Sequence, residues 1–340
     1  MLAFKKYNSI ENSFDKEFME RVMTEIPSDQ VYVVQEKVHG TNTSFLCDGK
    51  EVMFAKRTSI LAEDESFYNY PELVDRYRER VLGLFEELKT RYPEVMQISV
   101  FGEMFGGFYP HNDVKADHSS LIQKGVYYSP HHDFYAFDIF LFEGDDGKYL
   151  PVEEANRLFE AHGFFFARTL FEGTLQECLN YPNGFQSKIA EWLGLPIIED
   201  NLCEGVVIRP VEPRYLRNGS RVLIKNKNNR FAEKKSAKTR NKLFDEPVPY
   251  SEALKALIEE SEAYVNENRL YNVLSHLGEI RVPQDFGKVI GLMTKDALDD
   301  FLKEHGDEYL SLEKGEQKVL NKALNSLCAT QVKKEFLFLP

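Results

Sequence analysis

The pattern of apolar residues changes once along the chain, and the change falls near Pro247-Val248-Pro249. Upstream, short alternating or β-branched runs mix with amphipathic segments, which is typical of strands and helices in an α+β domain. Downstream, apolar residues recur at helical spacing. The stretch from Lys234 to Pro249 is polar and ends in prolines, so we expect a domain boundary there. We therefore predict one domain at residues 1–243 and a small all-α domain at residues 250–340.

Several runs in the first domain are expected to be short strands. They alternate or are rich in β-branched residues, and Asp48-Gly49 lies between two of them, where a hairpin turn is expected. A helix is expected over Pro71–Leu88, where apolar residues have helical spacing. The expected strands are Val31–Lys37, Thr43–Cys47, Val52–Arg57, Ile98–Phe105, Asp133–Phe142, Gly205–Arg209 and Arg221–Lys227. The helix N-caps expected in the second domain are Ser251, Thr294 and Ser311.

Composition argues against several classes of protein. No apolar run approaches the ~20 residues that cross a bilayer, and the first residues show neither a signal-peptide nor a transit-peptide pattern. The four cysteines are far apart and form no C-x-x-C pair, which argues against a zinc site or a disulfide framework. We therefore expect a cytoplasmic protein, in the host cytoplasm if it is viral, without a membrane partner and monomeric by default.

Charge is unevenly distributed along the chain. The net charge of −13, taken alone, argues against a nucleic-acid partner. From Arg214 to Lys242, however, eleven basic residues accompany one acidic residue, so this segment carries +10 and the rest of the chain −23. Such a basic stripe can bind phosphates at one surface of an acidic body, although a solvated face or a flexible linker can have the same composition.

The segment Glu36-Lys37-Val38-His39-Gly40-Thr41-Asn42 places a lysine where a strand runs into a turn. A lysine followed by glycine at such a bend puts an amine at the lip of a sheet, which suits a nucleophile that attacks phosphate. The amine must lose its proton before attack, and neighbouring cations favour that loss. Lys225 and Lys227 can supply them, because alternate residues of a strand share a face. Taken alone, Lys37 would more readily be interpreted as a surface lysine at a strand end before a hairpin glycine.

Four further segments carry side chains that suit a nucleotide site. Phe101-Gly102-Glu103 and Glu204-Gly205 each present a carboxylate at a strand end, suited to Mg²⁺ or a ribose. Phe137-Asp138 offers a ring for stacking on a base, and Lys56-Arg57 adds cations. The alternatives are structural salt bridges for the glutamates and a place in the core for the phenylalanine. The aspartate could orient a neighbouring cation or cap its strand.

Together these segments resemble the RNA ligase 2 family of the covalent nucleotidyltransferase superfamily. The motifs that follow the family's order are K-x-H-G-T-N at Lys37, F-G-E at Glu103, E-G-V-V-I-R-P at Glu204 and R-V-L-I-K-N-K-N at Arg221. The resemblance begins at Phe4-Lys5-Lys6-Tyr7 and reaches Asp285-Phe286-Gly287-Lys288-Val289, so it covers nearly the whole chain. It implies an α+β fold, in which a ligase-type nucleotidyltransferase domain with antiparallel sheets and flanking helices precedes a helical RNA-binding domain.

The resemblance also implies ATP and Mg²⁺ as cofactors and a role for each site residue. Lys37 would take AMP as a phosphoramidate, and Glu204 would organise the metal. The other residues implied at the nucleotide are Glu36 by its backbone, Asn42 and Arg57 near the sugar and phosphate, Glu103 at the ribose, Phe137 on the base, and Lys225 and Lys227 at the α-phosphate. His39 is expected on the pyrophosphate side, with a leaving-group acid or a structural hydrogen bond as alternatives. The residues expected to bind RNA are Arg217, Arg221, Lys234 and Lys235.

The implied activity is ATP-dependent joining of RNA 3′-OH and 5′-phosphate ends, which we expect at nicks in duplex RNA, through lysyl-AMP and RNA-adenylylate intermediates. Capping-type guanylyltransferases and DNA ligases are rivals, but they resemble this chain less because an OB-fold, a small β-barrel, would be expected where residues 250–340 indicate helices. A non-catalytic RNA-binding protein with an inactive ligase fold is the third alternative. The intact set Lys37, Glu204, Lys225 and Lys227 argues against it.

Overall fold

The computed structural model describes residues 2–117, 119–144, 146–231, 251–278, 280 and 284–336. The chain divides into two compact units, Met1–Arg230 and Phe231–Pro340, and the 3₁₀ helix η1 (Asn229–Phe231) contains their limit. The expected boundary lies outside the described residues, so the domain limits at residues 243 and 250 stay predictions. Within the described part of the chain, none of the helices has the length and hydropathy that crossing a bilayer requires.

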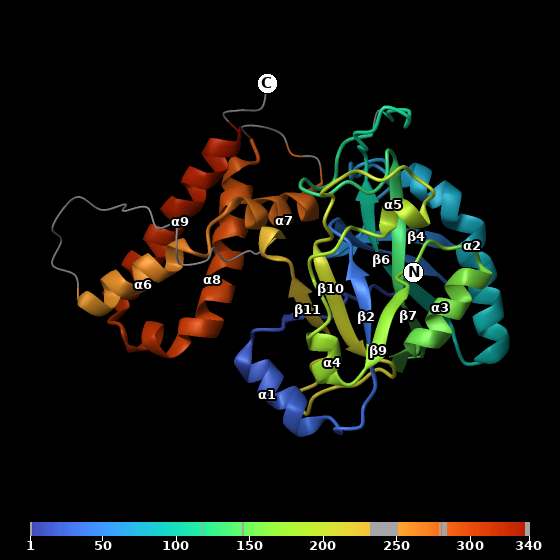
Figure 1. Cartoon of the computed structure of the whole chain (residues 1–340), viewed down its shortest axis with the longest axis horizontal. Helices are drawn as coiled ribbons and strands as arrows, with labels where there is room; N and C mark the ends of the chain where they lie inside the picture. The colour runs from blue at the N-terminus through green and yellow to red at the C-terminus, as the bar shows by residue number, and fades with distance from the viewer. Residues whose placement is uncertain are drawn as a thin grey trace. The chain divides into compact units, whose positions relative to one another are not determined.

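The first unit contains a five-stranded sheet with β2 next to its edge strand (Figure 1). Its described strands, in spatial order, are β1 (Glu11–Asn12), β11 (Ile224–Lys227), β10 (Gly205–Pro210), β2 (Tyr32–Lys37) and β9 (Thr169–Gly173). Neighbouring strands are antiparallel except β1 and β11, which are parallel. Helices α1 (Lys16–Glu25) and α4 (Leu175–Leu179) pack on one face, because Val22 and Cys178 are buried together with Val34 of β2.

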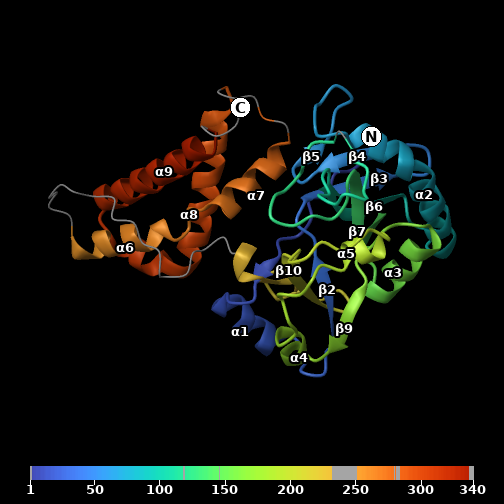
Figure 2. The same cartoon turned by 45° about the horizontal axis from the view of Figure 1, so that its top comes forward.

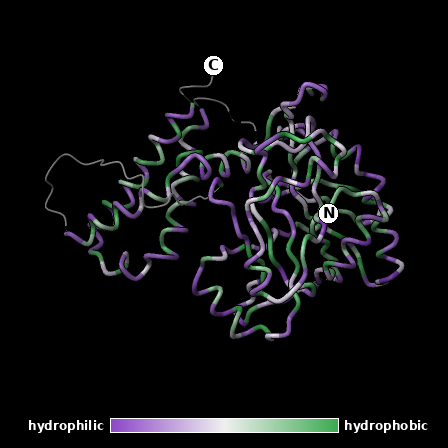
Figure 3. Tube along the Cα trace, viewed as in Figure 1, coloured by the Kyte–Doolittle hydropathy of each residue, from purple (hydrophilic) through white to green (hydrophobic). Residues whose placement is uncertain are grey.

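A six-stranded sheet forms the other half of this unit. Its described strands, in spatial order, are β5 (Ser59–Ile60), β4 (Val52–Lys56), β3 (Thr41–Cys47), β6 (Gln97–Gly106), β7 (His132–Glu143) and β8 (Asp146–Tyr149). Helices α2 (Tyr70–Arg91) and α3 (Val152–Ala161) lie on the same side of it (Figures 1 and 2). Leu84 of α2 and Leu158 of α3 are buried in one cluster with Val100 of β6. Figure 3 shows green and purple residues alternating along the helices, as one buried face requires.

One face of the five-stranded sheet carries charged residues that the sequence motifs singled out. Because successive strand residues point to opposite faces, the face away from α1 and α4 presents Lys37, Arg209 and Lys227. Arg209 Nη2 donates to the carbonyl oxygen of Phe137 on β7 at 2.6 Å. The two sheets therefore meet on this side, and the short helix α5 (Ile189–Trp192) follows a segment that contacts β2.

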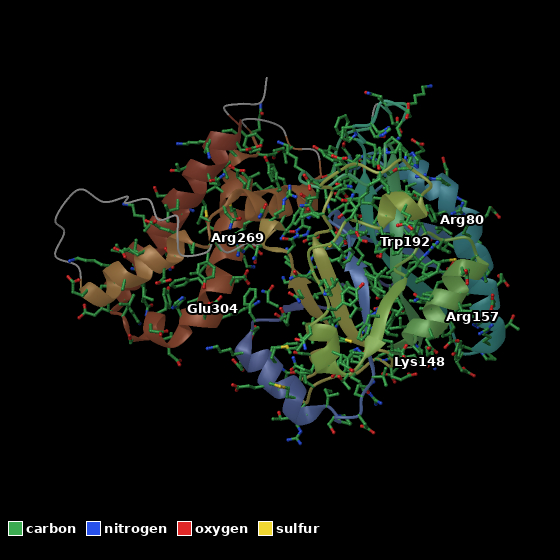
Figure 4. The ribbon with its side chains drawn as sticks, in the orientation of Figure 1. Arg80, Lys148, Arg157, Trp192, Arg269 and Glu304 are labelled. Carbon is green, nitrogen blue, oxygen red and sulfur yellow. The ribbon has the colours of Figure 1, made fainter. Side chains whose placement is uncertain are left out.

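The second unit is built from amphipathic helices around one apolar core. Its described helices are α6 (Glu252–Glu262), α7 (Glu267–Leu277), α8 (Phe286–Ser311) and α9 (Lys314–Phe336). Arg269 of α7 lies among these helices (Figure 4), where its guanidinium pairs with Asp296 and Asp300 of α8. Among the described residues, the expected helical character of residues 250–340 is confirmed, and so is the expected α+β fold.

The predicted strands and helix agree with the structure, whereas only one of the three predicted N-caps does. The expected strands and the helix over Pro71–Leu88 are confirmed with shifted ends, and Ser251 caps α6 through its Oγ. The caps expected at Thr294 and Ser311 are wrong, because both residues lie inside α8 and their hydroxyls donate to carbonyls of the preceding turn. A serine or threonine can satisfy its hydroxyl within a helix, so its presence does not mark a helix start.

Candidate active site

The candidate nucleophile, Lys37, is the last residue before the turn that joins β2 to β3. β2 ends at Lys37 and β3 begins at Thr41. A Cβ atom at Gly40 would lie 2.3 Å from the backbone oxygen of Met104 and 2.9 Å from the Cγ atom of Glu103. Since only glycine fits this close approach, Gly40 is what allows the turn to lie against the strand that carries Glu103.

Lys37, Glu204 and Lys227 come together at the ends of adjacent strands. Lys37 lies opposite Gly205, and Gly205 lies opposite Lys227, in the register of β2, β10 and β11. Lys37 Nζ is 2.7 Å from Glu204 Oε2, and Lys227 Nζ is 3.1 Å from Glu204 Oε1. One buried carboxylate thus lies between two amine groups that come from the strands on either side of β10.

Gly205 allows β10 and β11 to pair closely beside this carboxylate. Its φ of +146° is rarely adopted by residues with a side chain. A Cβ atom there would also lie 2.3 Å from the backbone oxygen of Asn226. The glycine that follows Glu204 in the sequence motif therefore has a structural cause.

The charges around Glu204 determine its protonation. Burial alone would raise the pKa of Glu204, but Lys37, Lys227 and His39 hold it well below its usual range. His39 Nδ1 is 3.4 Å from Glu204 Oε2. Glu204 is therefore an anion that three basic side chains surround, and His39 belongs to the same cluster.

Glu103 lies on the neighbouring sheet, opposite Asn42 in the register of β6 and β3. Burial raises the pKa of Glu103 to about 7, Lys37 and Arg57 act to lower it, and Glu204 acts to raise it. A Cβ atom at Gly40 would lie only 2.9 Å from Glu103 Cγ, so the structure brings Glu103 of the six-stranded sheet next to the turn that follows Lys37.

The raised pKa makes Glu103 a pH-dependent contributor to stability. Between about pH 4.5 and about pH 7, the folded protein binds more protons at Glu103 than the unfolded chain, so the free energy of unfolding falls as pH rises. Replacing Glu103 by glutamine should therefore raise that free energy by about 1 to 3 kcal/mol at about pH 8 and change it less at about pH 4. Urea unfolding of both proteins measures the difference. Equal effects at the two pH values would contradict this titration.

Lys225 and Glu36 lie next to the cluster on β11 and β2. Lys225 shares the face of Lys227, as strand alternation requires. The carboxylate of Glu36 instead accepts from Ser187 Oγ at 2.6 Å and from the backbone N–H of Lys188 at 2.9 Å. Burial raises the pKa of Glu36 to about 7, and these two donors lower it. Its side chain is therefore engaged by the protein, and the contact of its backbone with adenine stays a prediction.

Phe137 occupies a β-bulge where β7 pairs with β6. Its ring centroid lies 5.0 Å from that of Tyr7, and the ring packs against a buried cluster that contains Phe101. The side chain is only half-buried. Both alternatives for this residue are therefore compatible with the structure, and stacking on a base stays a prediction.

Asp138 forms a buried ion cluster, so it orients cations, which was one of its two predicted alternatives. Its Oδ2 atom accepts from Arg221 Nη1 at 2.6 Å and from Tyr7 OH at 2.8 Å, and it lies 3.0 Å from Arg209 Nη1. Arg209 also binds the carbonyl of Phe137. The cluster therefore fastens the strand that carries Phe137 to the five-stranded sheet. The sequence motifs did not indicate Tyr7 or Arg209 as members of such a cluster.

The residues expected to bind RNA divide into three groups. The prediction for Arg221 is wrong, because its side chain is 4% exposed and its guanidinium is paired with Asp138. Arg217 is exposed, and its backbone N–H donates to Glu25 Oε2 at 2.6 Å. Lys234 and Lys235 lie outside the described residues.

The carboxylates present fit a magnesium ion that is held largely by water. Among the described residues, no three His, Cys, Asp or Glu side chains are grouped to bind a metal ion. Mg²⁺ usually keeps several waters and is held by one or two carboxylates together with substrate phosphates. Glu204, the residue predicted to organise the metal, provides one such carboxylate beside Lys37 and Lys227.

Comparisons with known proteins cover most of the chain. Residues 30–227 match the family described as RNA ligase, and residues 248–330 match the family described as T4 RNA ligase 2 C-terminal. The chain is 30% identical over 333 residues to RNA-editing ligase 1, mitochondrial, of Trypanosoma brucei brucei, with 81% of this chain and 71% of that protein covered. It is 26% identical over 356 residues to RNA-editing ligase 2, mitochondrial, of the same organism, with 88% and 83% covered.

Solved structures give a more distant likeness. A Naegleria gruberi RNA ligase mutant with ATP and Mn has a TM-score of 0.42 and 16% identity, with 67% of this chain and 57% of that chain covered. A mutant of the same enzyme with AMP and Mn has the same values. The present chain thus matches somewhat more than half the length of these structures.

Proposed function

The chain belongs to the RNA ligase 2 family, and we propose that it is an ATP-dependent enzyme that joins 3′-OH and 5′-phosphate ends at nicks in duplex RNA. The observation that carries this proposal is the position of Lys37, whose Nζ lies 2.7 Å from a carboxylate that also binds Lys227. An amine at a strand end with a second cation next to it is well placed to attack a phosphate and to keep the product bound.

In the proposed first step, Lys37 Nζ loses a proton and forms a bond to the α-phosphorus of ATP, while the bond to pyrophosphate breaks. Lys225 and Lys227 stabilise the negative charge on the α-phosphate oxygens, because both lie on the same face of β11. His39 contacts the pyrophosphate side. The product is a lysyl-AMP.

The remaining residues of the site hold the nucleotide. Glu103 and Asn42 are cross-strand neighbours, which supports a joint role at the ribose, with Arg57 towards the phosphate. Phe137 stacks on the base. Glu204 would hold Mg²⁺, which would supply charge stabilisation to the phosphates when it is bound.

In the second step, AMP passes from Lys37 to the RNA 5′-phosphate, so the phosphoramidate bond breaks and a phosphoanhydride forms. In the third, the RNA 3′-OH attacks the activated phosphate, a phosphodiester forms and AMP leaves. The basic stripe that contains Arg217, Lys234 and Lys235 holds the duplex together with the helical second unit, reading shape and backbone.

Covalent labelling tests the nucleotide and the reaction type. With Mg²⁺ and ATP labelled at the α-phosphate, the protein is expected to acquire acid-labile label, whereas GTP labelled in the same way should give none. Label from GTP alone would replace the ligase proposal with a guanylyltransferase. Failure to label with either nucleotide would favour a non-catalytic RNA-binding protein.

Substrate preference is tested with matched RNA ends. A nicked RNA duplex should be sealed at least about 10-fold faster than the same two strands without the complementary strand, because the duplex holds both ends in line. The comparison uses gel separation of joined and unjoined strands under identical salt. Equal rates would contradict the duplex-nick preference and leave the ligase activity intact.

A further inference from the structure

Between β6 and β7, the described residues 107–117 and 119–131 form a long connection, which contacts the turn that follows Lys37. Loops longer than about 12 to 15 residues without secondary structure of their own are uncommon in compact domains and are usually either functional or linker segments. Its Tyr128 and Gln123 are both buried. Tyr128 OH accepts from the backbone N–H of His39 at 2.9 Å, and Gln123 Nε2 donates to the carbonyl of Gly40 at 3.2 Å.

A second tyrosine, Tyr135, contacts the backbone of the residue that precedes Lys37. Tyr135, at the start of β7, is 2% exposed, and its OH donates to the carbonyl oxygen of Glu36 at 3.2 Å. Tyr128 is also 2% exposed. The two hydroxyls therefore bind the backbone on either side of Lys37, at the residue before it and at the second residue after it.

The contact at His39 lies beyond the end of the sheet, where strand pairing no longer supplies hydrogen bonds to the backbone. Lys37 is the last residue of β2, and its partner Gly205 is the first of β10. The backbone N–H of His39 lies beyond both strands and is part-buried, so a hydrogen-bond acceptor from outside the sheet stabilises it. Tyr128 provides that acceptor.

The loop is itself fixed to the segment that precedes Glu204. Asn201 binds the backbone of Tyr127 twice, accepting from its N–H at 2.8 Å and donating to its carbonyl at 2.6 Å. Asn201 is buried. The same short segment thus positions both Tyr128 and the carboxylate that binds Lys37.

We propose that Tyr128 and Tyr135 are positioning residues that hold the backbone around Lys37 so that its amine is aligned for attack on the α-phosphate. The inference rests on the proposed lysyl-AMP chemistry. Alignment of reacting groups is worth much of the rate in such reactions, and a displacement of about 1 Å can cost on the order of 100-fold. Loss of either hydroxyl should therefore affect the step in which Lys37 is the nucleophile more than the step in which it is not.

The test replaces Tyr128 by phenylalanine, which removes one oxygen atom. Single-turnover formation of lysyl-AMP at saturating ATP should slow at least about 10-fold. The ATP concentration that gives half the maximal rate should stay within about 2-fold, since the nucleotide contacts are unchanged. Sealing of a pre-adenylylated nicked RNA should fall less than about 3-fold, because Lys37 is not the nucleophile there.

Tyr77→Phe is the matched control. Tyr77 is buried, and its OH donates to Asp133 Oδ1 at 2.7 Å, away from the turn at Lys37. It should lower the melting temperature about as much as Tyr128→Phe does, without slowing lysyl-AMP formation. Tyr135→Phe should give the same selective loss as Tyr128→Phe and serves if the latter does not fold.

The outcomes distinguish a failure of the proposed ligase function from a failure of the proposed positioning role of the tyrosines. If the wild-type protein forms no lysyl-AMP, the proposed function fails before the tyrosines are tested. If it does, and the tyrosine variants react at the wild-type rate or lose both steps in equal proportion, the positioning role is overturned.

Discussion

Replacing Lys37 by alanine is expected to abolish covalent labelling of the protein by ATP labelled at the α-phosphate. The reason is chemical, because the amine that would form the phosphoramidate bond is absent. Lys227 lies on the other side of Glu204, where the proposed reaction assigns it to the α-phosphate oxygens and not to the attack. Removal of a nucleophile typically costs several orders of magnitude in rate, so label should fall below detection. Quantification of protein-bound label after denaturing electrophoresis measures the effect.

Two controls make this experiment specific. Lys50 is an exposed lysine at the tip of the β3–β4 hairpin, and its replacement by alanine should leave labelling unchanged. The Lys37→Ala protein should still seal a pre-adenylylated nick, within about 10-fold of the wild type, because that step uses the RNA 3′-OH as nucleophile. Label that survives the Lys37 substitution would show that another residue carries the AMP. Loss of sealing together with labelling would point to a folding defect.

Most strands could be predicted because each sheet buries one face against helices. In β10, Val206 and Ile208 are buried in the cluster that contains α1, whereas Val207 points the other way. In the sequence, Val206, Val207 and Ile208 form one β-branched apolar run between Gly205 and Arg209, which predicts a buried strand but not the face that each residue takes. Helix α3 was missed although Leu158 and Phe159 are buried, because it begins after a proline without a side-chain cap and so lacks the usual start signal.

The chemistry of the site was predictable where residue types in a fixed order are informative, as at Lys37 and Glu204. Which of the charged residues are buried could not be predicted from these motifs. Arg221 lies 83 residues from Asp138 in sequence, and the packing of one sheet on the other decides whether this arginine meets an aspartate or solvent. Tyr128 was also unmarked, because residues 107–131 have no periodic pattern and its partner is a backbone N–H.

Replacing Asp138 by alanine is expected to produce the largest loss of stability in the first unit. Asp138 is 1% exposed, and it is the shared partner of Arg209 and Arg221, whose side chains are 3% and 4% exposed. Without the carboxylate, two buried guanidinium groups lose their anion while desolvation remains. Breaking a buried ion pair by removing one partner costs about 3 to 5 kcal/mol, so the free energy of unfolding should fall by at least about 3 kcal/mol.

Arg217 provides the matched comparison, because it belongs to the same basic stripe as Arg221 but is exposed. Arg217→Ala should change the free energy of unfolding by less than about 0.5 kcal/mol, whereas it should weaken binding of a nicked RNA duplex if the stripe contacts phosphates. Asp138→Asn keeps the shape of the side chain and one acceptor. Its decrease in the free energy of unfolding should therefore lie between those of Arg217→Ala and Asp138→Ala. Urea unfolding monitored by fluorescence gives all three values. A loss below about 1 kcal/mol for Asp138→Ala would mean that water reaches the two arginines, and Arg221 would again become a candidate for RNA binding.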